Sequence, residues 1–100
     1  MDQFAILALM RAKPGKERAL ENFLIAARSL VLAETETTNW YAVRLDDGRY
    51  GIFDTFPDQS GRDAHLGGEV ARQLMAKAAE LLAEPPIIQK LDILASKNPQ

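Results

Sequence analysis

The only histidine of the chain, His65, is the first candidate for chemistry, because imidazole alone has an ordinary pKa, ~6.5, near neutrality. If its helix packs on the sheet face that carries Asp54 and Tyr41, Asp54 can accept a proton from one ring nitrogen while the other nitrogen faces a pocket. Such an arrangement suits deprotonation of a phenol or quinol, which must become an anion before dioxygen reacts with it. The alternative is a histidine–aspartate pair that only satisfies two polar groups beneath the helix.

A second group of residues could bind a flat aromatic substrate. Trp40 and Phe53 offer faces for stacking, and the Arg44 guanidinium could stabilise a phenolate or a reduced oxygen species. Phe56 adds a further aromatic ring at the end of the same segment. The alternative is that the aromatic rings belong to the core or to a dimer interface, and that Arg44 pairs with a carboxylate.

These residues lie on a predicted β-hairpin. Asp47-Gly48 separates two runs rich in β-branched and aromatic residues, which predicts a two-residue turn of type I′. That turn pairs Asp46 with Arg49, Leu45 with Tyr50, Val43 with Ile52, and Tyr41 with Asp54. Paired residues share a face, so Tyr41 and Asp54 are expected on one face and Trp40, Arg44 and Phe53 on the other.

The rest of the chain predicts the elements that must position the hairpin. The apolar run Phe4–Met10 has the pattern of a strand covered on both faces, and residues 16 to about 33 have the three- and four-residue spacing of an amphipathic helix. After the hairpin come a helix start at residues 57–60, a break at Gly67-Gly68, a second helical segment from Glu69 to the Pro85-Pro86 pair, and a strand over Ile87–Ala95.

The resulting order, βαββαβ, is that of the ferredoxin-like α+β fold, an antiparallel sheet with both helices on one face. The first and last strands are apolar on both faces, and a soluble monomer rarely leaves an apolar sheet face uncovered. We therefore expect a second copy of the chain to cover that face in a C₂ homodimer. A monomeric mass at micromolar concentration would contradict this expectation.

Length and composition exclude several classes of protein. The 100 residues predict a single domain over residues 1–100. The net charge of −2 and the absence of a basic cluster argue against nucleic acid or an anionic membrane as a partner. One histidine and no cysteine argue against a metal site. The first apolar run ends at Arg11, too short for a membrane span and unlike a secretory signal, so a cytoplasmic location is expected.

Three segments of the chain resemble the antibiotic biosynthesis monooxygenase-like family of the dimeric α/β-barrel superfamily. They are Lys13–Glu17, Ile52–Asp58, and Ala64-His65-Leu66 followed by Val70 and Leu74. The resemblance spans nearly the whole chain and implies a ferredoxin-like fold that forms a dimeric α/β barrel. The family includes cofactor-independent monooxygenases of quinols and polycyclic phenols, haem-degrading enzymes, and members without an assigned activity.

The resemblance implies an oxidoreductase that oxidises a small phenolic or quinol substrate with dioxygen and without a cofactor, while the protein supplies a base, stacking and exclusion of water. The residues carried over are His65, Asp54 and Tyr41 as catalytic groups, and Trp40, Arg44, Phe53 and Phe56 as substrate-binding groups. One alternative is a non-enzymatic homodimer that binds a small aromatic or apolar ligand. Another, weaker one is a haem-binding or haem-degrading protein, since the family often has a second histidine where this chain has Val70.

Overall fold

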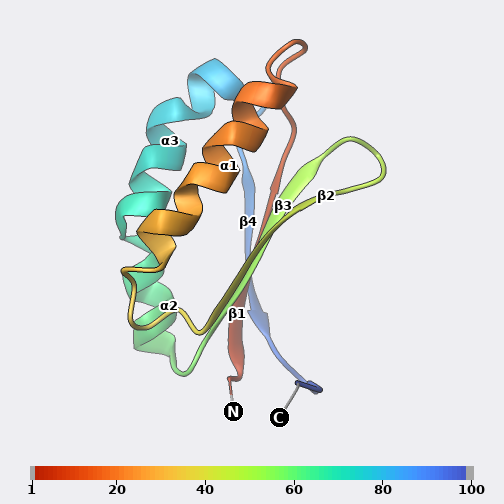
Figure 1. Cartoon of the computed structure of the whole chain (residues 1–100). Helices are drawn as coiled ribbons and strands as arrows, with labels where there is room; N and C mark the ends of the chain where they lie inside the picture. The colour runs from red at the N-terminus through yellow and green to blue at the C-terminus, as the bar shows by residue number, and fades with distance from the viewer. Residues whose placement is uncertain (1, 99–100) are drawn as a thin grey trace.

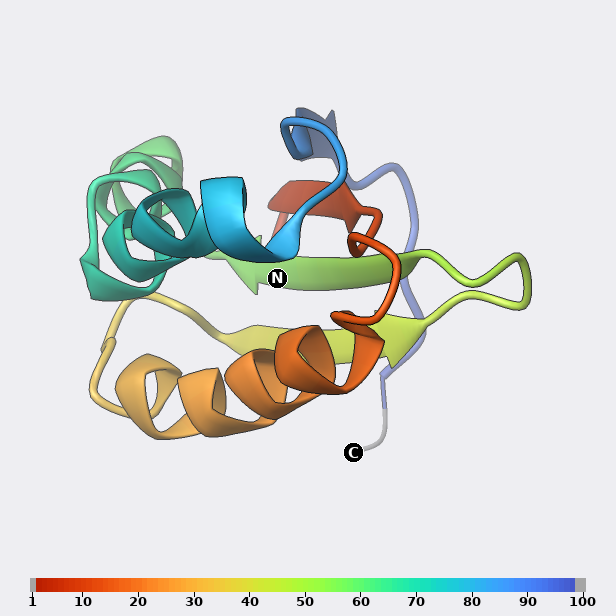
Figure 2. The ribbon, with the colours of Figure 1, turned by 90° about the horizontal axis from the view of Figure 1, so that it is seen from above.

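The computed structural model describes residues 2–98 and has the predicted βαββαβ order, with the second helix in two pieces (Figure 1). The elements are β1 (Phe4–Met10), α1 (Glu17–Val31), β2 (Asn39–Arg44), β3 (Tyr50–Phe56), α2 (Gln59–Leu66), α3 (Glu69–Leu81) and β4 (Ile87–Asp92). The strands form one antiparallel sheet in the order β2-β3-β1-β4. All three helices lie on the same face of this sheet (Figures 1 and 2), so the predicted fold class is confirmed.

The helices follow from the spacing and the capping signals in the sequence. α1 turns its apolar stripe, Leu20, Leu24, Ala27 and Val31, toward the sheet. α2 begins after Asp58, whose carboxylate accepts a hydrogen bond from the Gly61 N–H at 2.8 Å. The chain then breaks and restarts as α3, which places His65 in the last turn of α2, facing the sheet.

The predicted register of the hairpin is wrong by one residue. Leu45 N–H donates to the Arg49 carbonyl at 2.8 Å, so the loop holds the three residues between them rather than two. Gly48 N–H also donates to the Leu45 carbonyl at 3.1 Å, and Gly48 has φ +89°. This is a three-residue loop in which a turn is followed by a left-handed glycine.

The shift of one residue exchanges the two faces of β2. Trp40 pairs with Asp54 and Tyr41 pairs with Phe53, where Tyr41 was expected opposite Asp54. Trp40 and Arg44 therefore share the helix-covered face with Asp54. Tyr41 and Phe53 lie on the opposite face.

That opposite face carries apolar side chains from all four strands. They are Leu7, Leu9, Tyr41, Val43, Phe53, Ile87 and Leu91. Tyr41 is 56% exposed, Val43 47% and Ile87 49%. No helix within residues 2–98 covers this face. In the same part of the chain, no helix is both long and apolar enough to span a bilayer.

Candidate functional site

His65 lies between two carboxylates. Its Nε2 is 2.9 Å from Oδ2 of Asp54 on β3, and its Nδ1 is 2.6 Å from Oε1 of Glu34, in the connector between α1 and β2. The three side chains differ in exposure: that of Asp54 is 1% exposed, that of His65 9% and that of Glu34 20%. We call these three residues the Asp54–His65–Glu34 array. It joins the connector, α2 and the sheet at one point.

The array contains the predicted neighbours His65 and Asp54, but the second ring nitrogen does not face a pocket as expected. It meets Glu34, a residue that sequence reasoning did not single out. The visible signal was a polar connector of five residues, Glu34–Thr38, after an apolar helix. Glu34 and Glu36 look equivalent in that segment, and only the position of α2 above it selects Glu34.

The electrostatics of the array favour a proton on both ring nitrogens. Burial alone would lower the pKa of His65, but its contacts with Asp54 and Glu34 and their negative charges outweigh burial and raise that pKa above its ordinary value. The imidazolium is the only form of histidine with a donor for each carboxylate. Glu34 Oε1 also accepts a hydrogen bond from the Thr37 hydroxyl at 2.7 Å.

His65 is the only ion-pair partner of Asp54 among residues 2–98. The Nε2···Oδ2 contact is short but poorly aligned, and neither carboxylate oxygen has a well-formed hydrogen bond with any residue from 2 to 98. A buried carboxylate in that position is costly unless a charge balances it. The imidazolium of His65 is the balancing charge.

Glu34 stands in the wall of two pockets. The first, of about 440 Å³, lies between the end of α1 and β2 and includes Trp40 in its lining. The second, of about 390 Å³, lies beside α2 and the start of α3 and includes His65. Glu34 and Thr37 line both pockets, so these two residues belong to the wall between them.

The structure distributes the predicted aromatic residues over different environments. Trp40 packs against the core beside the array, and its indole Nε1 is buried without a hydrogen-bond partner among the described residues. Phe56 is 0% exposed and its ring centroid lies 5.3 Å from that of His65, so it supports the imidazole and cannot stack on a substrate. Tyr41 and Phe53 lie on the other face of the sheet, away from the array. The structure therefore does not bring Tyr41 or Phe53 to His65, and it buries Phe56 against the imidazole ring.

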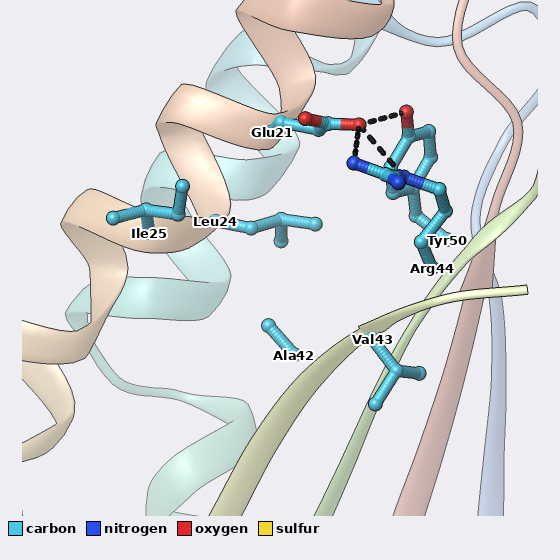
Figure 3. Close-up of a pocket in the computed structure, with 7 residues that line it drawn as sticks. All are labelled: Glu21, Leu24, Ile25, Ala42, Val43, Arg44 and Tyr50. Atoms are coloured by element: carbon cyan, nitrogen blue, oxygen red, sulfur yellow. Dashed lines mark hydrogen bonds and ion pairs between the residues drawn. The ribbon is translucent and has the colours of Figure 1, made fainter.

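Arg44 belongs to a separate cluster with Glu21 and Tyr50 (Figure 3). Glu21 Oε2 accepts from the Tyr50 hydroxyl at 2.6 Å, and it also lies 3.0 Å from Nε and 2.8 Å from Nη2 of Arg44. The hydrogen bond to Glu21 is the main cause that raises the pKa of Tyr50. The cluster borders a pocket of about 160 Å³ between α1 and the hairpin. Arg44 is thus paired with a carboxylate, as the alternative interpretation had it.

The donor set does not favour a metal or haem site. Within residues 2–98 no three side chains of the types that bind metals lie close enough together to hold an ion. Both nitrogens of His65 contact carboxylates in this structure, so a haem iron would have to displace one of these carboxylates.

Neither a family model nor a curated protein sequence matches the chain. Among solved structures, the NE2512 protein from Nitrosomonas europaea, whose function is unknown, is 46% identical, with a TM-score of 0.95 over 100% of this chain and 97% of that one. Rv0793 from Mycobacterium tuberculosis is 23% identical, with a TM-score of 0.84 over 95% and 98% of the two chains.

A protein from Caulobacter crescentus assigned as an antibiotic biosynthesis monooxygenase is 18% identical. Its TM-score is 0.80, over 94% of this chain and 92% of that one. At this identity the likeness shows the fold.

Proposed function

This chain belongs to the same family as the NE2512 protein, and it has the fold of proteins assigned as antibiotic biosynthesis monooxygenases. We propose that it is a cofactor-independent monooxygenase of a small phenolic or quinol substrate. The observation that supports the proposal is the Asp54–His65–Glu34 array. It holds a titratable imidazole between a buried carboxylate and a carboxylate that reaches two pockets. Perturbed histidines of this kind are concentrated at functional sites.

In the proposed reaction, His65 is the proton acceptor. Neutral His65 keeps its Nε2–H toward Asp54, and Nδ1 takes the proton of the substrate hydroxyl, directly or by way of the Glu34 carboxylate. Asp54 stabilises the imidazolium that forms, as the carboxylate of a catalytic triad does. Trp40 lines the first pocket, where its indole ring would contact a flat substrate.

The oxidation itself draws its electrons from the substrate. For an anthrone, the enol tautomer carries the hydroxyl that His65 deprotonates. The resulting enolate reduces dioxygen, one oxygen atom becomes the new carbonyl of the quinone, and the other leaves as water with the two hydrogens that the methylene group held. The protein supplies the base and a partly dry pocket in which the anion forms. No additional reductant is required for this balance.

Oxygen consumption tests the proposal. Purified protein is mixed with a panel of quinols and anthrones in air-saturated buffer, and the rate is compared with the spontaneous rate. We expect acceleration with at least one member, and its loss in His65→Ala. A panel that shows no acceleration would remove the enzymatic interpretation.

A ligand-binding protein without catalysis is the second candidate, and one observation favours it. Both ring nitrogens of His65 are occupied, so the array can be read as a closed structural link. Ligand affinity separates the two candidates. If His65 is a base, His65→Ala abolishes oxygen consumption but barely changes the dissociation constant of a substrate analogue.

We also propose that a second copy of the chain covers the open sheet face. The apolar side chains of all four strands on that face support this, because isolated apolar patches of this kind mark interfaces. Sedimentation should give a dimer, and Val43→Lys, on the edge strand β2 of that face, should shift the mass toward the monomer. A wild-type monomer at micromolar concentration would refute the dimer.

A further inference from the structure

We propose that Glu34 is a gate between the two pockets, and that loss of the proton from His65 releases it. The inference rests on the proposed function for its purpose, since the gate would expose the base as the base becomes active. The movement itself requires no substrate and can be measured without one. Its evidence is the unequal burial of the two carboxylates that share one imidazole.

The imidazole can satisfy both carboxylates only while it is protonated. A neutral ring has one N–H, and Asp54 and Glu34 then compete for it. Asp54 is 1% exposed and has no well-formed hydrogen bond among residues 2–98, whereas Glu34 is 20% exposed and also accepts from Thr37. A carboxylate left without a donor costs more in the interior than at the surface, so the N–H stays with Asp54.

Glu34 then faces a lone pair. Nδ1 without its proton and Glu34 Oε1 are both acceptors, and at 2.6 Å they repel each other. The Glu34 side chain can respond by turning toward water, since its only other hydrogen bond within residues 2–98 is with the Thr37 hydroxyl. Asp54 has no such alternative, because it lies beneath α2 on the central strand β3.

The departure of Glu34 would join the two pockets. Its side chain stands in the wall of the pocket of about 440 Å³ that holds Trp40 and of the pocket of about 390 Å³ that holds His65. Once the wall is open, Trp40 and Nδ1 of His65 border one cavity. The same proton loss that makes Nδ1 a base therefore gives a ligand access to it.

The other charged side chains near His65 make no contact with its ring nitrogens among the described residues. β1, which packs against α2, carries no titratable side chain. The remaining charged groups are Glu36 in the connector, Glu69 on α3 and paired with Arg72, Asp63 on α2, and Arg62 on α2, which donates to the Leu91 carbonyl. Among the described residues, only Asp54 and Glu34 touch the ring nitrogens.

The chain has one histidine and one tryptophan, so His65 reports on the loss of the proton and Trp40 reports on the opening of the pocket wall. The ring resonances of His65 give its protonation by NMR, and Trp40 emission and its quenching by acrylamide report on the pocket wall. In substrate-free wild-type protein we expect a red shift and stronger quenching as pH rises, with the same midpoint as the His65 titration. A Trp40 signal that stays flat while His65 titrates would overturn the gate.

Two matched variants locate the effect. In Glu34→Gln the amide can donate to neutral Nδ1, so the wall stays closed and the Trp40 transition is lost while His65 still titrates. Glu36→Gln, in the same connector, should keep the two midpoints together. An unchanged Trp40 transition in Glu34→Gln would overturn the gate. Matching midpoints in a protein that oxidises no quinol would keep the gate and refute only the proposed function.

Discussion

Replacing Asp54 with asparagine would remove the buried negative charge beside His65 with almost no change in shape. A charged hydrogen bond contributes about 1.5–3 kcal/mol to stability, and breaking a buried ion pair costs about 3–5 kcal/mol. The larger figure does not apply, because Glu34 stays on the other nitrogen and His65 can give up its proton. We therefore expect Asp54→Asn to lower the free energy of unfolding by about 2 kcal/mol near pH 6.

The pH dependence gives the sharper test. The pKa of folded His65 is raised, so its stabilisation is complete below the unfolded pKa of ~6.5 and is lost as pH rises through the folded pKa. Between those two values the wild-type free energy of unfolding should fall by about 1.4 kcal/mol per pH unit from this group. Asp54→Asn removes one cause of the raised pKa, so the pH interval between the unfolded and folded pKa of His65 is shorter in the variant. The difference in the free energy of unfolding between variant and wild type should therefore narrow at alkaline pH.

Urea unfolding at about pH 6 and about pH 9, with the NMR titration of His65, measures both quantities. Asp46→Asn is the matched control, because Asp46 is exposed in the hairpin loop and should change neither. The reasoning fails if His65 titrates at the wild-type pH in Asp54→Asn. It also fails if the loss of stability is the same at both pH values.

Four further tests address separate parts of the structure. Gly68→Ala should lose roughly 1 kcal/mol in urea unfolding, because a Cβ there lies 3.2 Å from the His65 carbonyl oxygen, whereas Gly67→Ala, with its nearest neighbour at 3.8 Å, should be tolerated better. Gly48→Ala should cost about 1 kcal/mol because of its φ of +89°, and a neutral result would argue against the three-residue loop. Oxygen consumption should rise with pH as His65, whose pKa is raised, loses its proton, and a falling profile would contradict its role as base. Tyr41→Phe should keep the activity, since Tyr41 lies on the other sheet face, and its loss would restore Tyr41 to the site.

The order of the elements could be predicted because each one carries its own local signal. The apolar stripe of α1, the break at Gly67-Gly68 and the Pro85-Pro86 pair depend on neighbours in sequence, and the structure reproduces them. Three ends differ: α1 ends at Val31 rather than near residue 33, α3 ends at Leu81 before the Pro85-Pro86 pair, and β4 ends at Asp92 rather than Ala95. Ends of this kind fray and depend on what packs over them.

The hairpin register could not be predicted from the same signals. An Asp-Gly pair fits a two-residue turn, but a glycine with positive φ also fits the last position of a three-residue loop. In the structure Asp46 is the first residue of a three-residue loop. Within this loop the Arg49 N–H donates a hydrogen bond to the Asp47 carboxylate at 3.0 Å. One residue of difference was enough to move Tyr41 off the face that carries Asp54 and to bring Trp40 and Arg44 onto it.

The candidate site could be predicted only as far as the His65–Asp54 pair. Glu34 is absent from any local pattern, because its contact with His65 spans 31 residues and depends on how α2 lies over the connector. Its discovery changes the chemistry that the site supports. In place of a base with one open nitrogen, the site holds a ring with a carboxylate at each nitrogen. This ring accepts a substrate proton by way of Glu34, or directly once Glu34 has moved away.

The unequal exposure of the two carboxylates indicates that Glu34, and not Asp54, is the partner that leaves His65. If both were buried, a neutral His65 would leave one of them without a donor in the interior, and the array would only be a structural link with a cost at alkaline pH. If both carboxylates were exposed, neither would raise the pKa of His65 substantially. The Asp54 side chain is 1% exposed and holds the imidazole in place. The Glu34 side chain is 20% exposed and can leave the imidazole, so that a ligand takes its position. Substitution of Asp54 should therefore change mainly stability and the pKa of His65, and substitution of Glu34 mainly access to the ring.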